Sequence, residues 1–142
     1  MDLNYYHTLI TAADDCPVAH SVEPEGRGGK LIVALLQYRM LSGSPYVFTQ
    51  EEVLFRTWLQ RQELPEALPQ EEIARLREQF FSRPQACLRA SPLPKRYGWG
   101  LLFDREGRVA LCPMESQEYQ EIVSGKNAAG VKVLKAMRSK RA

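Results

Sequence analysis

RYGWGLLFDREGRVALCP, residues 96–113, is the stretch that decides the fold. Two largely apolar runs, 97–104 and 108–113, flank the polar turn sequence DREG. Short runs of aromatic and β-branched residues on either side of a turn sequence are typical of β-hairpins. Gly107 can supply the positive φ that a tight hairpin loop needs. The sequence therefore predicts an antiparallel hairpin over 96–113.

A strand and two helices are expected near the N-terminus. Residues 4–11 (NYYHTLIT) are aromatic and β-branched with partial alternation, which is typical of a strand. The apolar run 30–41 is long enough to favour a helix over a strand. The sequence TQEE at 49–52 matches a capping box, so another helix should begin there and end before Pro65. The spacing of its apolar residues predicts a buried stripe of Val53, Leu54, Trp58 and Leu59.

Prolines mark out the remaining segments. Pro69 suits the first turn of a helix that should end at Pro84. Residues 85–95 contain closely spaced prolines and predict an extended, ordered segment. Residues 115–123 predict a helix, and residues 131–137 a short helix or strand. The sequence therefore predicts an α+β fold, in which a small antiparallel sheet, made of the N-terminal strand and the 96–113 hairpin, packs against four or five helices.

Composition points to one globular domain spanning residues 1–142, with 130–142 as its basic C-terminal segment. Of the 142 residues, 44% are hydrophobic and 25% are charged, which is ordinary for a folded domain. The three cysteines, Cys16, Cys87 and Cys112, are too widely spaced for a CxxC zinc or redox motif and do not form a disulfide framework. No signal-peptide pattern or membrane-spanning apolar run is visible, so we expect a cytoplasmic protein without a membrane partner. The oligomeric state stays open.

Charge is distributed unevenly along the chain. Residues 1–83 carry 8 basic and 12 acidic residues, a balance of −4, whereas residues 84–142 carry 11 and 5, a balance of +6. Such asymmetry predicts an anionic partner for the basic part of the chain. The alternative is a solvated basic tail, or one that complements the acidic N-terminal part.

The segment 89–100 (RASPLPKRYGWG) is the strongest candidate for a binding site. Arginine can hold a phosphate or carboxylate through two parallel hydrogen bonds, and aromatic rings can stack on bases. Glycine within a strand often marks the close approach of a ligand or another backbone. The alternative is that the aromatic residues belong to the core and the glycines make room for a helix. The predicted binding residues are Arg89, Lys95, Arg96, Tyr97 and Trp99, joined by Arg138 of the basic tail.

Signals for catalysis or for a metal are weak. Cys87 precedes Arg89, which could favour its thiolate, but a catalytic cysteine also needs a base, and only His7 and His20 exist. The acidic loop around Asp14 and Asp15 matches no known metal-binding spacing. The GRGG sequence at 26–29 lacks the ending of a phosphate-binding loop. We therefore expect no catalytic residue beyond the candidate Cys87, no metal and no cofactor.

Three phrases of the sequence resemble a known family. They are PYVFTQEEVLF (45–55), FFSRPQACLRASPLPKRYGWG (80–100) and LKAMRSKRA (134–142). They are similar to the bacterial DUF6157 proteins of unknown function, and the resemblance extends over nearly the whole chain. It implies a bacterial, single-domain, cytoplasmic protein and supplies no activity. Lys95, Trp99 and the pair Glu118-Tyr119 also resemble, more faintly, a pattern in the MmcQ/YjbR-like proteins, a group proposed to bind DNA.

Two classes of function follow from these observations. The first is a non-enzymatic binding domain for an anionic partner such as nucleic acid, in which the arginines and Lys95 contact phosphates and an aromatic ring stacks. The second is a small enzyme or ligand-binding domain acting on an anionic small molecule, which requires a histidine near Cys87. A protein–protein adaptor that uses the acidic helix starting at Thr49 is a third possibility.

Overall fold

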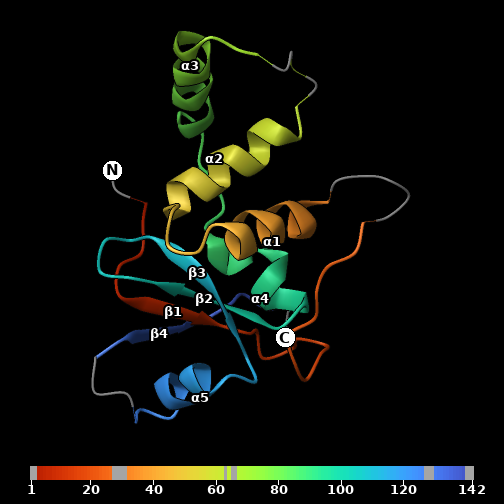
Figure 1. Ribbon diagram of the computed structural model, residues 1–142, viewed down its shortest axis with the longest axis vertical. Helices are drawn as coiled ribbons and strands as arrows, with labels where there is room; N and C mark the ends of the chain where they lie inside the picture. Colours follow the sequence, from red (N-terminus) through yellow and green to blue (C-terminus); the bar gives the residue numbers. More distant parts are fainter. Residues whose placement is uncertain (1–2, 27–31, 63, 65–66, 127–129, 140–142) are drawn as a thin grey trace.

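A four-stranded sheet with helices on both faces organises the protein (Figure 1). The computed structural model describes residues 3–26, 32–62, 64, 67–126 and 130–139. Within these residues the elements follow in the order β1 (Thr8–Thr11), α1 (Val33–Gly43), α2 (Gln50–Gln60), α3 (Gln70–Phe81), a short 3-10 helix η1 (Leu88–Ala90), α4 (Pro92–Arg96), β2 (Trp99–Phe103), β3 (Val109–Pro113), α5 (Gln117–Val123) and β4 (Lys132–Lys135). The α+β prediction is confirmed.

The predicted hairpin forms the β2–β3 half of the sheet. The two strands pair antiparallel with Leu101 opposite Leu111. Gly107 has a φ of 83°, so the loop uses the glycine as expected. The Asp104 side chain accepts hydrogen bonds from the backbone N–H groups of Glu106 and Arg108, which holds the turn.

The other half of the sheet corrects the prediction of an all-antiparallel arrangement. The strand order is β3-β2-β1-β4, and β1 is antiparallel to β2 but parallel to β4. After β3 the chain runs through α5 and returns to the far side of β1, and a crossover of this kind brings a strand back in the same direction. The sheet is therefore mixed, and the segment left open as helix or strand at 131–137 contains a strand.

Alternation along the strands sends side chains to two separate cores. Ile10, Leu101 and Phe103 belong to the larger core, together with residues of α1, α2 and α4. Leu9 and Leu102 point the other way and pack with α5. Figure 1 shows α5 below the sheet and α1, α2 and α3 above it. The hairpin thus lies in the middle layer.

The helix α2 begins as predicted, but its buried face differs from the expected stripe. Thr49 accepts from the Glu52 backbone, and the Glu52 carboxylate accepts from the Thr49 backbone, which completes the capping box. The fully buried residues of α2 are Gln50, Val53, Phe55 and Thr57. Of the expected stripe, only Val53 is fully buried. Leu54 is half-buried against the larger core, Trp58 packs on Phe80 of α3, and Leu59 is half-buried. Pro65, the expected stop, lies outside the described residues.

Most of the segment 85–95 is helical rather than extended, which is a second correction. It contains η1 and α4, and the Ser91 side chain caps α4 by accepting from the Leu93 backbone at 3.2 Å. Pro92 occupies the first turn, where its missing N–H costs no hydrogen bond. Tyr97 follows α4 as its C-cap, so the first strand of the hairpin begins at Trp99 rather than at the start of the apolar run 97–104.

Candidate functional site

The arginine-rich segment and the basic C-terminal strand lie against each other. The Arg89 side chain donates from Nε to the carbonyl oxygen of Lys135 at 2.8 Å. The Arg89 carbonyl oxygen in turn accepts from the backbone of Met137, also at 2.8 Å. These two bonds join η1 to the end of β4, so basic residues that are far apart in the sequence share one region.

An acidic residue lies among these basic ones. The Asp14 carboxylate is 3.1 Å from the Lys135 Nζ and 3.4 Å from the Arg138 guanidinium. Hydrogen bonding and charge from Lys135, followed by those from Arg138, hold the pKa of Asp14 below its usual value. Asp15 accepts from the Ser139 backbone at 3.2 Å. The loop after β1 therefore offsets part of the positive charge.

Two predicted basic residues have no carboxylate partner within the described part of the chain. They are Lys95 and Arg96, in the last turn of α4. Arg96 lines a hollow of about 270 Å³ with Asp15, Pro17 and Ser139, next to the end of the chain. We call the surface made by Arg89, Lys95, Arg96, Lys135 and Arg138 the basic face.

The predicted aromatic residues are used mainly in packing. The Trp99 indole donates to the Val22 carbonyl oxygen at 2.8 Å, and its ring centroid lies 5.4 Å from that of Tyr38. Both Tyr97 and Trp99 are half-buried against the larger core. The structure thus places Arg89 and Arg96 next to the C-terminal segment that carries Arg138, whereas the Tyr97 and Trp99 rings pack against the protein's own core.

The two glycines that flank Trp99 make room for other parts of the same chain. A Cβ at Gly98, whose φ is 75°, would lie 2.9 Å from the His20 carbonyl oxygen. A Cβ at Gly100 would lie 2.8 Å from both the Cys112 carbonyl oxygen and the Tyr119 ring. The approach of a neighbouring loop and of α5, rather than of a ligand, accounts for these glycines.

Cys87 contacts a phenol. Burial of the Tyr5 phenol, followed by its interaction with the nearby Cys87 thiol, raises the pKa of Tyr5 to about 12. Tyr5 packs on Phe103 at one end of β2, whereas His20 lies beside Gly98 at the other end. His20 is therefore not placed to act as a base for Cys87.

The long loop after β1 is held by several hydrogen bonds. Ser21 donates from its hydroxyl to the Gly98 carbonyl oxygen at 2.7 Å, and its backbone donates to Glu115 at 2.9 Å. Within the described residues no group of three His, Cys, Asp or Glu side chains comes together in a way that could hold a metal ion. Arg27, Gly28 and Gly29 of the GRGG sequence lie outside the described residues.

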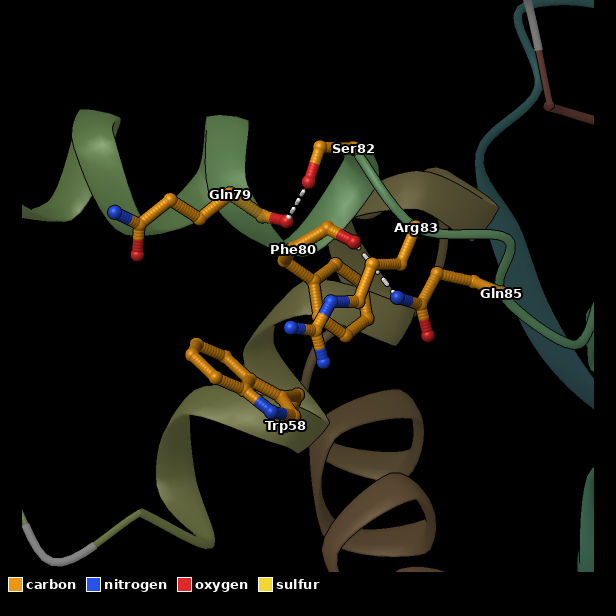
Figure 2. Close-up of a pocket in the computed structure, with 6 residues that line it drawn as sticks. All are labelled: Trp58, Gln79, Phe80, Ser82, Arg83 and Gln85. Carbon is orange, nitrogen blue, oxygen red and sulfur yellow. Dashed lines mark hydrogen bonds between the residues drawn. The ribbon is translucent and has the colours of Figure 1, made fainter.

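The sequence analysis missed a hollow of about 430 Å³ between α2 and the end of α3. Trp58 and Phe80 form its aromatic wall, with ring centroids 5.3 Å apart. Figure 2 shows the Arg83 guanidinium extending toward the indole ring of Trp58. The Gln85 amide is fixed by donating to the Phe80 carbonyl oxygen at 2.7 Å. Such a hollow can accept a flat group against the indole ring, with one cation beside it.

Trp58 was missed because its spacing suggested a core residue. In the structure it is half-buried, since α3 covers only part of the α2 surface. A larger hollow of about 700 Å³ shares Ser82, Arg83 and Gln85 with the first and extends to Leu3 and Arg77. The sequence signal that could have indicated this region was the arginine-bearing end of α3, next to two adjacent phenylalanines.

Comparison with known proteins identifies a family and no relative of known activity. Within the described residues, no helix has the length and apolar character needed to cross a membrane. Neither the curated proteins nor the solved structures yield a match to this chain. A family model, described as "Family of unknown function (DUF6157)", matches residues 1–142. The three phrases at 45–55, 80–100 and 134–142 therefore carried a correct assignment: the chain belongs to the DUF6157 family.

Proposed function

We propose that this protein is a non-enzymatic binding domain of the bacterial cytoplasm whose anionic partner is nucleic acid. The basic face holds the sugar–phosphate backbone. Lys95 and Arg96 contact phosphates directly, and Arg89 and Arg138 add to the positive potential.

The observation that supports this proposal is the pair of hydrogen bonds between Arg89 and the end of β4. These bonds hold the segment that carries Arg89 against the segment that leads to the basic tail, although the two are far apart in the sequence. They put Arg89 beside the end of β4, and Arg96 lines a hollow with Ser139 of the same tail. The carboxylates of Asp14 and Asp15 offset part of the charge. Excess positive charge confined to one face is the electrostatic signature of phosphate-backbone binding.

The packing of Tyr97 and Trp99 makes the proposal more specific. Since the Trp99 indole N–H is already bonded to Val22, its ring is held for the core rather than presented to a base. Contacts to phosphate position a nucleic acid but carry no sequence information. The proposed binding is therefore independent of sequence and is governed by charge.

Salt dependence is the direct test. Fluorescence anisotropy with a labelled single-stranded oligonucleotide should show binding at about 50 mM salt that falls steeply by about 200 mM. The logarithm of the affinity should fall linearly with the logarithm of salt concentration, by about 0.7 for each phosphate contacted on a single strand. Lys95→Gln and Arg96→Gln should each make this slope shallower by about 0.7, the contribution of one phosphate contact.

Arg105→Gln is the matched control. It removes the same charge at the exposed tip of the hairpin, away from the basic face. Its slope should equal that of the unmodified protein. Absence of binding at low salt would contradict the proposal, and so would an equal loss in all three variants.

The enzymatic alternative has less support from the geometry. Cys87 lies near Tyr5 at one end of β2, and His20 lies near the other end. No described contact joins either group to the hollow beside Trp58.

A further inference from the structure

A groove between α1 and α2 is lined by two arginines that face no acid. Arg39 of α1 and Arg56 of α2 line a hollow of about 400 Å³, which we call the two-arginine groove. Ser44 and Gln60 add polar groups, and Met40 and Phe48 supply apolar surface. Its volume lies within the range of pockets that take small molecules.

Neither arginine forms an ion pair within the described residues. The ion pairs found there use other cations, and no aspartate or glutamate lines the groove. Glu52 lies one turn before Arg56, the spacing at which a helical ion pair would form. Its carboxylate is instead engaged with Thr49, where it completes the capping box.

Helix ends do not account for these charges either. A cation is favoured at the carboxyl end of a helix, but the effect fades beyond the last turn. The last turn of α1 and that of α2 contain no basic residue, so Arg39 and Arg56 lie further in. Arg83, by contrast, follows the end of α3, where the free carbonyl groups already favour it. Two like charges in one groove repel each other unless an anion joins them.

Stacking holds one of the two guanidinium groups in place for such an anion. The Arg56 guanidinium carbon lies 4.7 Å from the centre of the Phe48 ring. Stacking uses the face of the planar group and leaves its N–H edges free for hydrogen bonds. The Ser44 hydroxyl and the Gln60 amide line the same groove and can bond further oxygens.

We propose that the two-arginine groove binds a phosphate monoester carrying an apolar or aromatic body. A monoester bears close to two negative charges at neutral pH, which matches two guanidinium groups. Its organic part packs on Phe48, Met40 and Leu36. The site is separate from the basic face and does not depend on nucleic-acid binding there.

Thermal denaturation and calorimetry with two probes test this proposal. Phenyl phosphate and inorganic phosphate should both raise the melting temperature at constant ionic strength, and phenyl phosphate should do so at lower concentration. Arg39→Gln and Arg56→Gln should each weaken phenyl phosphate binding by about tenfold or more, since each removes a charged hydrogen-bond donor. Without ligand, Arg39→Gln should not lower the melting temperature, because it relieves repulsion. Arg56→Gln also loses the stacking on Phe48, so calorimetry compares the affinities at a temperature where every variant is folded.

Arg61→Gln, at the exposed end of α2 and outside the groove, is the control and should bind phenyl phosphate normally. Equal affinity in the unmodified protein, Arg39→Gln and Arg56→Gln would overturn the proposal, as would no binding of either probe. The Lys95→Gln and Arg96→Gln variants should retain phenyl phosphate binding. Their result separates a failure of this groove from a failure of the basic face.

Discussion

Gln50 joins three distant segments through one side-chain amide. It is the first residue of α2 and is only 2% exposed. Its Oε1 accepts from the Leu88 backbone at 2.8 Å, and its Nε2 donates to the Leu3 carbonyl oxygen. A buried amide is tolerated because both ends are bonded. Gln50 thereby anchors the start of η1, and with it the segment that leads to Arg89.

Removing this amide should destabilise the whole protein. Gln50→Ala leaves the buried Leu88 N–H without a partner, and we expect a loss of about 1–3 kcal/mol in the free energy of unfolding. Urea denaturation followed by tryptophan fluorescence measures it. Gln60→Ala, at the exposed end of the same helix, should change stability by less than about 0.5 kcal/mol. Equal effects of the two substitutions would show that the Gln50 bonds contribute nothing.

Residue-level roles were the hardest to predict from the sequence. The capping box at Thr49 and the turn glycine Gly107 were predicted correctly, because each depends on neighbours only a few residues away. Gln50 was missed because its partners, Leu3 and Leu88, are distant from it in the sequence on either side. The surroundings of the two tryptophans also differ from those predicted. Trp58, expected in the core, lines a hollow, whereas Trp99, expected at a binding site, packs against the larger core. Which tryptophan is covered depends on where α3 and the loop after β1 pack.

At the scale of elements, α3 stands apart from the rest. It contains no fully buried residue and lies furthest from the sheet in Figure 1. Aromatic contacts of Phe80 with Trp58 and Phe55 fasten its last turn, with ring centroids 5.3 and 5.9 Å apart. The Arg77 guanidinium adds an ion pair of 3.5 Å with Glu51. Few buried contacts make α3 an element that can open by itself.

Substitution of Phe80 should therefore loosen α3 alone. In Phe80→Ala, we expect the backbone amides of α3 to lose about tenfold or more in protection from hydrogen exchange, since a half-buried aromatic contributes roughly 1.5 kcal/mol or more. The amides of β2 should keep their protection, and they serve as the internal reference. Hydrogen exchange followed by mass spectrometry resolves the two elements. A parallel loss in β2 would show that α3 is part of the global folding unit.

The elements themselves were largely predictable, and the exceptions have physical causes. The hairpin, α2 and α5 were predicted correctly, because neighbouring residues in the sequence determine each of them. The segment 85–95 was expected to be extended because it contains prolines, yet proline is compatible with a first helical turn, and Ser91 caps α4. The direction of β4 could not be predicted, since it depends on a crossover through α5 past two other strands.

At the scale of the whole molecule, ion pairs link the N-terminal loop to the basic C-terminal part of the proposed binding surface. Asp14, in the loop after β1, lies between Lys135 and Arg138 and competes with any anionic partner for both. Its lowered pKa means that it is fully charged at neutral pH. The sequence analysis left open that the basic tail complements the acidic N-terminal part, and Asp14 is one such acidic neighbour, but sequence alone could not indicate which carboxylate the tail meets.

Neutralising Asp14 should strengthen nucleic-acid binding. Asp14→Asn frees Lys135 and Arg138 for phosphate, so we expect a several-fold gain in affinity at low salt and a steeper salt dependence. Glu106→Gln makes the same change in net charge at the hairpin tip, where Glu106 pairs with Arg108. Anisotropy titrations of the two variants separate the effect of freeing Lys135 and Arg138 from the effect of the higher net charge. An equal gain in both would mean that net charge alone governs binding.

The position of β1 has a consequence for the order in which the fold can assemble. β1 comes first in the chain, yet it sits between β2 and β4, with Thr8 opposite Phe103 on one side and Lys132 on the other. The hairpin strands meet across a short loop, whereas β1 must close loops that span most of the chain. Contacts of such long range slow folding, and until they form β2 presents an unpaired edge. We therefore expect the pairing of β1 with β2 and β4 to form after the hairpin during folding.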